Sequence, residues 1–150
     1  MRIAYGADDE NDTTRAVVGY LAGAGHEVLR ATGSDRWPDI GAAVGRAVVA
    51  GQADYGVVMC WTGTGTAIAA NKVPGVRAAL AWDPWIARGA RAWNDANVLA
   101  LSLKRLAPDV AVEVVTAFLE DIAADPDEAE NIARLDRICA QPEEDGSPPA

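Results

Sequence analysis

The sequence of 150 residues predicts an α/β fold with a five-stranded parallel sheet. Short apolar runs alternate five times with segments of helical periodicity, and this alternation is typical of a parallel sheet joined by right-handed crossovers. The run at 54–60 is almost continuously apolar, as expected for a strand covered on both faces. The length suits one domain, which we place at residues 1–140, followed by a flexible tail at 141–150.

Five apolar runs bounded by turn residues are interpreted as the strands. The first of them ends at the loop that begins Gly6-Ala7-Asp8-Asp9. The strands are expected at residues 2–6, 26–31, 54–60, 76–82 and 97–101. Because ligands of parallel sheets bind at the carboxyl ends of the strands, the loops that follow them are the candidate sites.

Helical spacing and terminator residues place the helices between these strands. Apolar residues recur at helical spacing in the segment 12–24, and glycines end it. The second helix is expected to begin at Asp39, as an N-cap behind Pro38, and to end at Gly51. The remaining helices are expected at 67–70, after a glycine loop, and at 84–92, 110–122 and 127–140.

Composition excludes several classes of function. Thirteen basic and 22 acidic side chains give a net charge of −9, which repels nucleic acid and anionic lipid. No run approaches the ~18 uncharged apolar residues of a membrane span, and the first residues lack the pattern of a secretory signal. We therefore expect a cytoplasmic protein. The two cysteines, Cys60 and Cys139, are too few and too far apart for a zinc knuckle.

Cys60 is the residue with the clearest chemical setting. It ends a buried strand and precedes a glycine loop and a helix N-terminus, where backbone amides and the helix dipole favour a thiolate. Gly63 and Gly65 let amides approach a ligand closely, and such amides stabilise an oxyanion or enolate. The pair lacks the third glycine of a dinucleotide-binding fingerprint. Cys60 is thus a candidate base or nucleophile, the alternative being a small buried hydrophobe.

A longer pattern extends through this loop. Residues 60–79 read CWTGTGTAIAANKVPGVRAA and residues 93–100 read WNDANVLA. These runs resemble the family of type B ribose-5-phosphate isomerases and galactose-6-phosphate isomerases. The resemblance implies a three-layer αβα, Rossmann-like domain. It also implies a homodimer or dimer of dimers with shared active sites, and isomerisation of sugar phosphates without metal or organic cofactor.

The resemblance also implies roles for individual residues. Cys60 would be the base that moves a proton between C2 and C1 through a cis-enediolate, with Thr62 assisting the thiol. Asp8 would bind sugar hydroxyls, and Asn94 would lie beside the reacting oxygens. Some members use a glutamate as base at the position of Thr66, so Cys60 is the only base on offer here. The loop residues whose amides would hold the developing negative oxygen are Thr62, Gly63, Thr64, Gly65 and Thr66.

The chain departs from the family pattern around the expected pocket. Trp93 stands where relatives carry a histidine that helps open the sugar ring, and Asp9 stands where they carry a histidine of the phosphate site. Trp37 replaces a tyrosine of the sugar pocket, and Trp61 replaces the glycine after the base. The one histidine of the chain, His26, is expected in a turn away from the site.

The basic residues change as well. Arg137 matches one phosphate-binding arginine of the family, and Lys104 replaces another. Carboxylates such as Asp8 and Asp9 would repel a phosphate by about 1 kcal/mol per close pair, whereas indoles stack well on sugar C–H faces. We therefore expect a neutral, amino or otherwise substituted sugar as substrate.

Other readings of the sequence remain open. One alternative is a non-catalytic sugar- or nucleoside-binding protein on the same scaffold. A thiol redox or acyl-transfer role for Cys60 is less favoured, because no histidine is placed to activate the sulfur. Trp82 and Trp85 are expected in the core or at an interface rather than in the site.

Overall fold

The five strands form one parallel sheet in the order β2-β1-β3-β5-β4, which confirms the expected α/β architecture. The computed structural model describes residues 1–140, so the tail expected at 141–150 lies outside the described part of the chain. Strand β3 is central, between β1 and β5. The strands are β1 (Arg2–Ala7), β2 (Glu27–Arg30), β3 (Tyr55–Cys60), β4 (Ala78–Leu80) and β5 (Val98–Ser102).

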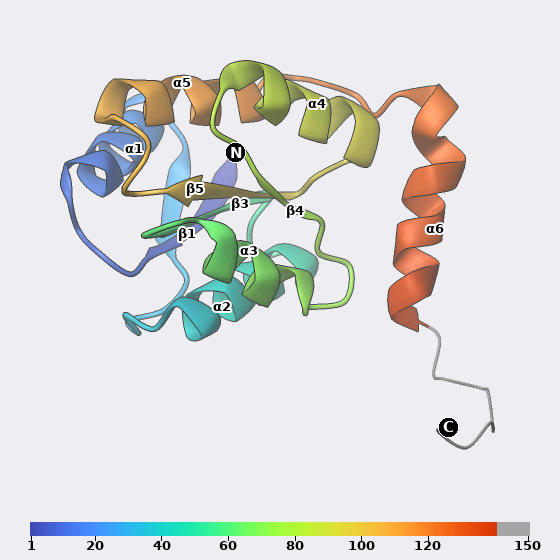
Figure 1. The fold of residues 1–150 in the computed structure, drawn as a ribbon, viewed down its shortest axis with the longest axis horizontal. Coiled ribbons are helices and arrows are strands. Elements are labelled where there is room, and N and C mark those ends of the chain that lie inside the picture. Colours follow the sequence, from blue (N-terminus) through green and yellow to red (C-terminus); the bar gives the residue numbers. More distant parts are fainter. Residues whose placement is uncertain (141–150) are drawn as a thin grey trace.

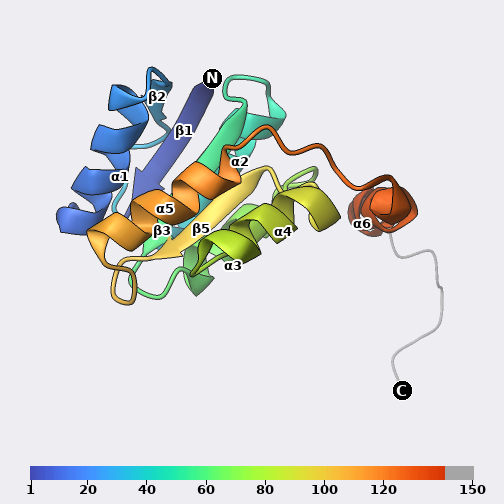
Figure 2. The same cartoon turned by 90° about the horizontal axis from the view of Figure 1, so that it is seen from above.

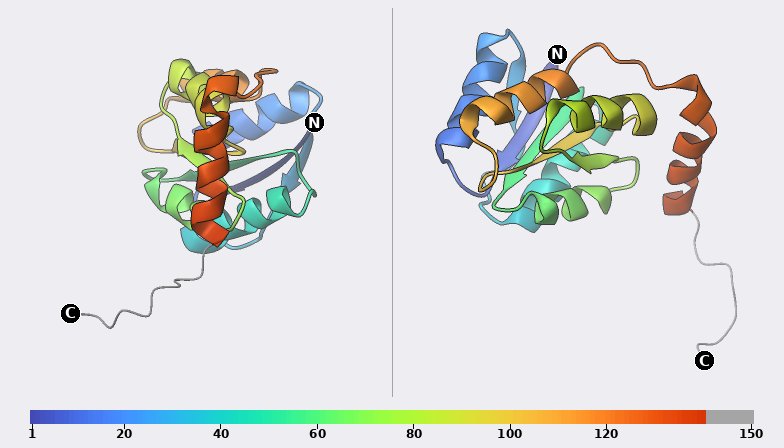
Figure 3. Two further views of the ribbon diagram at one scale, coloured as in Figure 1. Left: turned by 90° about the vertical axis from the view of Figure 1, so that its right-hand side faces the viewer. Right: turned by 45° about the horizontal axis from the view of Figure 1, so that its top comes forward.

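Helices cover both faces of the sheet and make the three layers of the fold (Figure 1). One face is covered by α1 (Asp12–Gly23), α4 (Pro84–Asn94) and α5 (Pro108–Phe118). The other face is covered by α2 (Trp37–Val49) and α3 (Thr64–Asn71), which lie below the sheet in Figure 1, whereas Figure 2 looks onto the side of α1, α4 and α5. A 3-10 turn, η1 (Pro126–Glu128), leads into α6 (Ala129–Ala140), which stands apart from the layers (Figure 3).

The alternation of side chains along β3 fixes the direction in which its last residue points. Val57 and Met59 belong to the core cluster beneath α1, α4 and α5. Val58 belongs to the cluster beneath α2 and α3. Because successive side chains of a strand point to opposite faces, Cys60 lies on the same face as Val58, toward α2 and α3.

Two helix starts differ from the sequence-based expectation. Helix α2 begins at Trp37, so Asp39 is not its N-cap, and the residue before the helix is Arg36. Proline fixes φ and lacks an N–H, so Pro38 is suited to the first turn of the helix. Helix α3 begins at Thr64 rather than after the glycine loop. The loop residues 64–66 are therefore the first turn of α3.

Further differences lie toward the C-terminus and at the sheet edge. The edge strand β4 spans Ala78–Leu80 and is shorter than the expected 76–82. Helix α5 ends at Phe118, so the expected extension to residue 122 is wrong. Trp82 and Trp85 are 61% and 68% exposed, so they are not core residues of this chain. Among residues 1–140, no helix combines the length and apolar character needed to cross a bilayer.

Candidate active site

The strand order changes direction between β1 and β3, and a ligand-binding crevice is expected at the carboxyl ends of these two strands. From β1 the chain continues through α1 to β2 on one side, and from β3 it continues through α3 toward β4 on the other. Ligands of open α/β sheets bind where the connections diverge in this way. Asp8 follows β1 and Cys60 ends β3, and the Asp8 amide donates to the Met59 carbonyl at 3.2 Å. The two sequence-predicted residues therefore lie on neighbouring strand ends.

Cys60 is the last residue of β3 and lies at this point of the sheet. Its side chain is 4% exposed, and the hydroxyl of Thr66 lies 3.4 Å from Sγ. The Cys60 carbonyl accepts hydrogen bonds from the amides of Gly63 at 3.2 Å and Leu103 at 2.9 Å. The sulfur is therefore fixed, nearly covered, and within hydrogen-bond reach of one hydroxyl.

The N-terminus of α3 supplies amides next to this sulfur. Gly63 precedes the helix with φ +78°, and a Cβ there would lie 2.5 Å from a Leu80 methyl carbon, so only glycine fits. The first-turn amides of a helix lack intrahelical acceptors and point beyond its N-terminus. Among the described residues, the amides of Thr64, Gly65 and Thr66 have no acceptor within the protein. They can therefore hold a negative oxygen.

Close packing of α2 on α3 positions this turn. A Cβ on Gly41 of α2 would lie 2.5 Å from the carbonyl oxygen of Thr66 and 2.9 Å from the amide nitrogen of Ala70. The indole of Trp37 packs on Gly65, where an added Cβ would lie 3.0 Å from two ring carbons. The backbone of α2 thus approaches α3 at Gly41, and Trp37 borders the glycine loop.

Carboxylates gather on the β1 side of the crevice. Burial raises the pKa of Asp8, the charge of Asp9 raises it further, and a hydrogen bond from the Trp61 amide lowers it in part. Asp9 and Glu10 are exposed, and Glu10 pairs with Arg30 at 3.2 Å. Of these three carboxyl groups, only that of Asp8 is partly buried, and it accepts a hydrogen bond from the Trp61 amide of the Cys60 loop.

An indole and an ammonium group lie on the β5 side. Trp61 is 54% exposed, and Lys104 Nζ lies 5.0 Å from the centroid of its ring. The Ser102 hydroxyl donates to the Trp61 carbonyl at 2.8 Å and fixes the base of the loop. Thr62 turns its hydroxyl to that of Thr64 at 2.7 Å, so among the loop threonines the hydroxyl on the sulfur is that of Thr66.

Other residues implied by the resemblance lie far from Cys60 within one chain. Trp93 and Asn94 end α4, just before β5 begins at Val98, so they lie at the amino-terminal edge of the sheet. Cys60 pairs with Ser102 at the carboxyl edge. Five residues of strand span about 16 Å between the two edges. Arg137 lies on α6, also beyond the amino-terminal edge (Figure 1).

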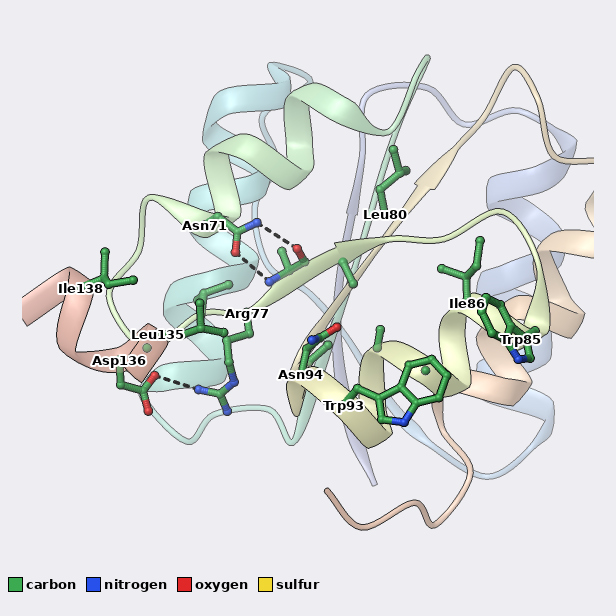
Figure 4. A pocket seen from close by; sticks show the side chains of 17 residues that line it. Asn71, Arg77, Leu80, Trp85, Ile86, Trp93, Asn94, Leu135, Asp136 and Ile138 are labelled. Carbon is green, nitrogen blue, oxygen red and sulfur yellow. Dashed lines mark hydrogen bonds and ion pairs between the residues drawn. The ribbon is translucent and has the colours of Figure 1, made fainter. Parts of the chain in front are cut away.

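Trp93 and Asn94 border a separate cavity of about 570 Å³ between the body of the fold and α6 (Figure 4). Its walls include Trp85 from α4 together with Leu135 and Ile138 from α6. The ion pair between Arg77 and Asp136, at 3.0 Å, ties α6 to the start of β4. Most of the lining of this cavity is apolar, and it includes neither Cys60 nor any residue of the loop 61–66.

Sequence reasoning missed two residues that shape the site. Gly41 and Ser102 carry no chemical signal in the sequence, since one is a glycine inside a helix and the other a serine at a strand end. Their roles depend on tertiary contacts with Thr66 and Trp61. Only the register of β5 against β3, which places Ser102 beside Cys60, reveals the second of them.

The chain is similar in sequence and in overall structure to several known proteins. A family model described as Ribose/Galactose Isomerase matches residues 3–138. The putative sugar phosphate isomerase YwlF of Bacillus subtilis is 41% identical over 88 residues, which are 59% of each chain. The D-erythrulose-4-phosphate isomerase of Pectobacterium atrosepticum is 35% identical over 80% of this chain and 83% of its own. A Clostridium thermocellum ribose-5-phosphate isomerase B structure superposes with TM-score 0.86 and 35% identity, covering 92% of this chain and 97% of that one.

Proposed function

Because the chain belongs to the Ribose/Galactose Isomerase family, we propose that it interconverts an aldose and a ketose with Cys60 as the base. The observation that carries this proposal is the position of the Cys60 sulfur. It lies beside a hydroxyl donor and at the N-terminal turn of α3, whose free amides can stabilise an enediolate. Asp8 on the neighbouring strand end supplies an acceptor for sugar hydroxyls.

The proposed reaction moves one proton from C2 to C1 and one from the C2 oxygen to the C1 oxygen. The Cys60 thiolate takes the hydrogen from C2 of the open-chain aldose, and the electrons of that C–H bond form the C1–C2 double bond of a cis-enediolate. The carbonyl oxygen gains negative charge, which the amides of Thr64, Gly65 and Thr66 stabilise. The thiol then returns the proton to C1, while the proton of the C2 hydroxyl passes to the C1 oxygen. C2 thereby becomes the carbonyl of the ketose, C1 becomes a CH2OH group, and Cys60 is again a thiolate.

We propose that the complete site needs a second copy of the chain. Trp93, Asn94 and Arg137 lie at the edge of the sheet opposite to Cys60, so they cannot reach a sugar at the sulfur of their own chain. A homodimer, or a dimer of dimers, would bring these residues from one copy to the Cys60 crevice of another. Shared sites of this kind are compatible with a closed two-fold interface.

The surroundings of Cys60 support a substrate other than a plain pentose phosphate. Asp8 and Asp9 place negative charge beside the crevice, and the indoles of Trp37 and Trp61 offer faces that suit the C–H surface of a sugar. The Pectobacterium relative is named for a four-carbon sugar phosphate, so sugar preference varies among related chains. We propose a non-phosphorylated or substituted sugar as the preferred substrate.

Hydrogen exchange in heavy water tests this proposal. The protein is incubated with ribose 5-phosphate, erythrulose 4-phosphate and free aldoses, and NMR follows deuterium incorporation at C1 and C2. We expect exchange with at least one sugar and a higher kcat/KM for a free or substituted sugar than for ribose 5-phosphate. Efficient, saturable turnover of ribose 5-phosphate alone would refute the substrate preference. Ligand-induced stabilisation without any exchange would instead indicate a non-catalytic binding protein.

A further inference from the structure

We propose that Trp61 determines the charge preference of the Cys60 site by holding the ammonium group of Lys104 on its indole face. The inference rests on the proposed function, because it assigns a cause to the preference among sugars at that site. The contact between Trp61 and Lys104 can be measured by binding and by spectroscopy in the absence of turnover.

The backbone places these two residues side by side. The Lys104 amide donates to the Trp61 carbonyl at 3.1 Å, so the chain leaving β5 runs beside the chain leaving β3. Lys104 Nζ then lies 5.0 Å from the centroid of the Trp61 ring, within the range of a cation–π interaction. No carboxylate among residues 1–140 forms an ion pair with Lys104. The indole is therefore the group that attracts this ammonium.

The charge balance around the crevice makes Lys104 important for an anionic ligand. Arg30, a cation on the β1 side, is engaged by Glu10 at 3.2 Å. Asp8 and Asp9 repel an incoming phosphate. A phosphate bound beside Trp61 draws on the Lys104 ammonium group, in addition to any arginine that contacts it, and it must compete with the Trp61 ring for that ammonium. A neutral sugar does not compete for the ammonium group, because it can stack on the face of the Trp61 ring that Lys104 leaves free.

The size of the effect follows from the strength of the competing interaction. A cation–π contact at an exposed site changes an equilibrium constant by a factor of about two to five. Removing the indole face should therefore strengthen phosphate binding by about that factor. The same change should leave the affinity for a neutral sugar equal or lower, because a stacking surface is lost.

The contact itself can be observed by NMR. The chain contains only two lysines, Lys72 and Lys104, so reductive methylation with ¹³C-formaldehyde gives two lysine signals in addition to that of the Met1 α-amine, while the cation is retained. We expect one signal shifted upfield by the indole ring current. It should disappear in Lys104→Met, remain in the matched control Lys72→Met, return to the unperturbed position in Trp61→Leu and stay shifted in Trp61→Phe. Two unshifted signals in the unsubstituted protein would overturn the proposal.

Titration with inorganic phosphate measures the functional consequence. Binding is followed through the ¹⁵N amide signals of residues 64–66. Trp61→Leu should lower the phosphate Kd about two- to fivefold, Trp61→Phe should leave it nearly unchanged, and the double variant Trp61→Leu/Lys104→Met should lose the gain. A weaker or unchanged Kd in Trp61→Leu would overturn the inference. Such a result leaves the proposed isomerase function intact, which fails only if no sugar exchanges hydrogen.

Discussion

The hydroxyl of Thr66 lies between two acceptors, 3.4 Å from Cys60 Sγ and 3.2 Å from the carbonyl oxygen of Gly63. A hydroxyl has one hydrogen to donate, so it can serve one acceptor at a time. While Cys60 is a neutral thiol, the carbonyl is the stronger acceptor. When Cys60 carries negative charge, the same hydroxyl can rotate to the sulfur. The buried side chain of Thr66 thus can stabilise the charged form of Cys60 without any backbone movement.

Thr66→Val should reduce turnover while preserving shape. The variant keeps the branched side chain but removes the donor to the thiolate. Because a hydrogen bond to a charged group is worth about 1.5–3 kcal/mol, kcat should fall about tenfold or more. Thr62→Val is the matched control, since the Thr62 hydroxyl bonds to Thr64. If steady-state kinetics show a larger decrease in kcat for Thr62→Val than for Thr66→Val, Thr62 is the residue that assists the thiol.

Asp8→Asn should make the folded state more stable at neutral pH. Burial raises the pKa of Asp8, so folding favours the protonated form of this carboxyl group. The resulting contribution to the free energy of unfolding is fully present below the unfolded-state pKa and is lost as the pH rises through the folded-state pKa. Asparagine stays neutral and avoids that loss. The free energy of unfolding measured with urea should therefore be higher for the variant than for the unsubstituted protein at about pH 7, and equal for the two at about pH 3. If Asp8→Asn were equally more stable than the unsubstituted protein at low pH, the raised pKa of Asp8 could not be the cause.

Gly41→Ala should disturb the turn that carries Thr66. The added Cβ would lie 2.5 Å from the Thr66 carbonyl oxygen, and backbone there cannot yield without moving α3. Overpacking of this kind costs about 2 kcal/mol of unfolding free energy, and kcat should fall with it. Gly19→Ala in α1 meets no atom within 4 Å, and should instead be neutral or stabilising by up to about 1 kcal/mol. Equal thermal midpoints for the two variants would refute the packing argument.

Mixing two inactive variants tests whether sites are shared between copies. Cys60→Ala and Asn94→Ala each damage a different half of the proposed site. If the halves come from two copies, a mixed dimer contains one intact site, so unfolding and refolding an equimolar mixture should restore about a quarter of the original activity. A mixture as inactive as its components would show that both residues act within one chain.

Much of the fold follows from sequence pattern. The apolar run ending at Cys60 predicts a parallel strand covered on both faces, and β3 lies between β1 and β5 with helices on both faces of the sheet. Helix boundaries are less predictable, because they depend on tertiary contacts that compete with local signals. Asp39 has the chemistry of an N-cap, yet the helix starts at Trp37, and the Asp39 carboxylate accepts the Ser34 hydroxyl at 2.9 Å instead.

The part of the site that one continuous segment forms could be predicted from the sequence. The residues that reach the site from distant segments could not be recognised by a local pattern. The loop from Cys60 to Thr66 forms one strand end and one helix turn, so its sequence alone indicates amides beside a sulfur. Gly41 and Ser102 act through contacts with segments distant in sequence. The placement of Asn94 at the opposite edge of the sheet follows from parallel topology, once each helix is assigned to its connection.

The most direct test of the central claim compares the protein with Cys60→Ala for exchange of the C2 hydrogen in heavy water, using the best substrate from the panel. Circular dichroism should first show that the variant is folded, as expected for a small change at one buried side chain. The account predicts exchange by the unsubstituted protein and none by the variant above the uncatalysed rate. Exchange by Cys60→Ala at the original rate would contradict the role of Cys60 as the base.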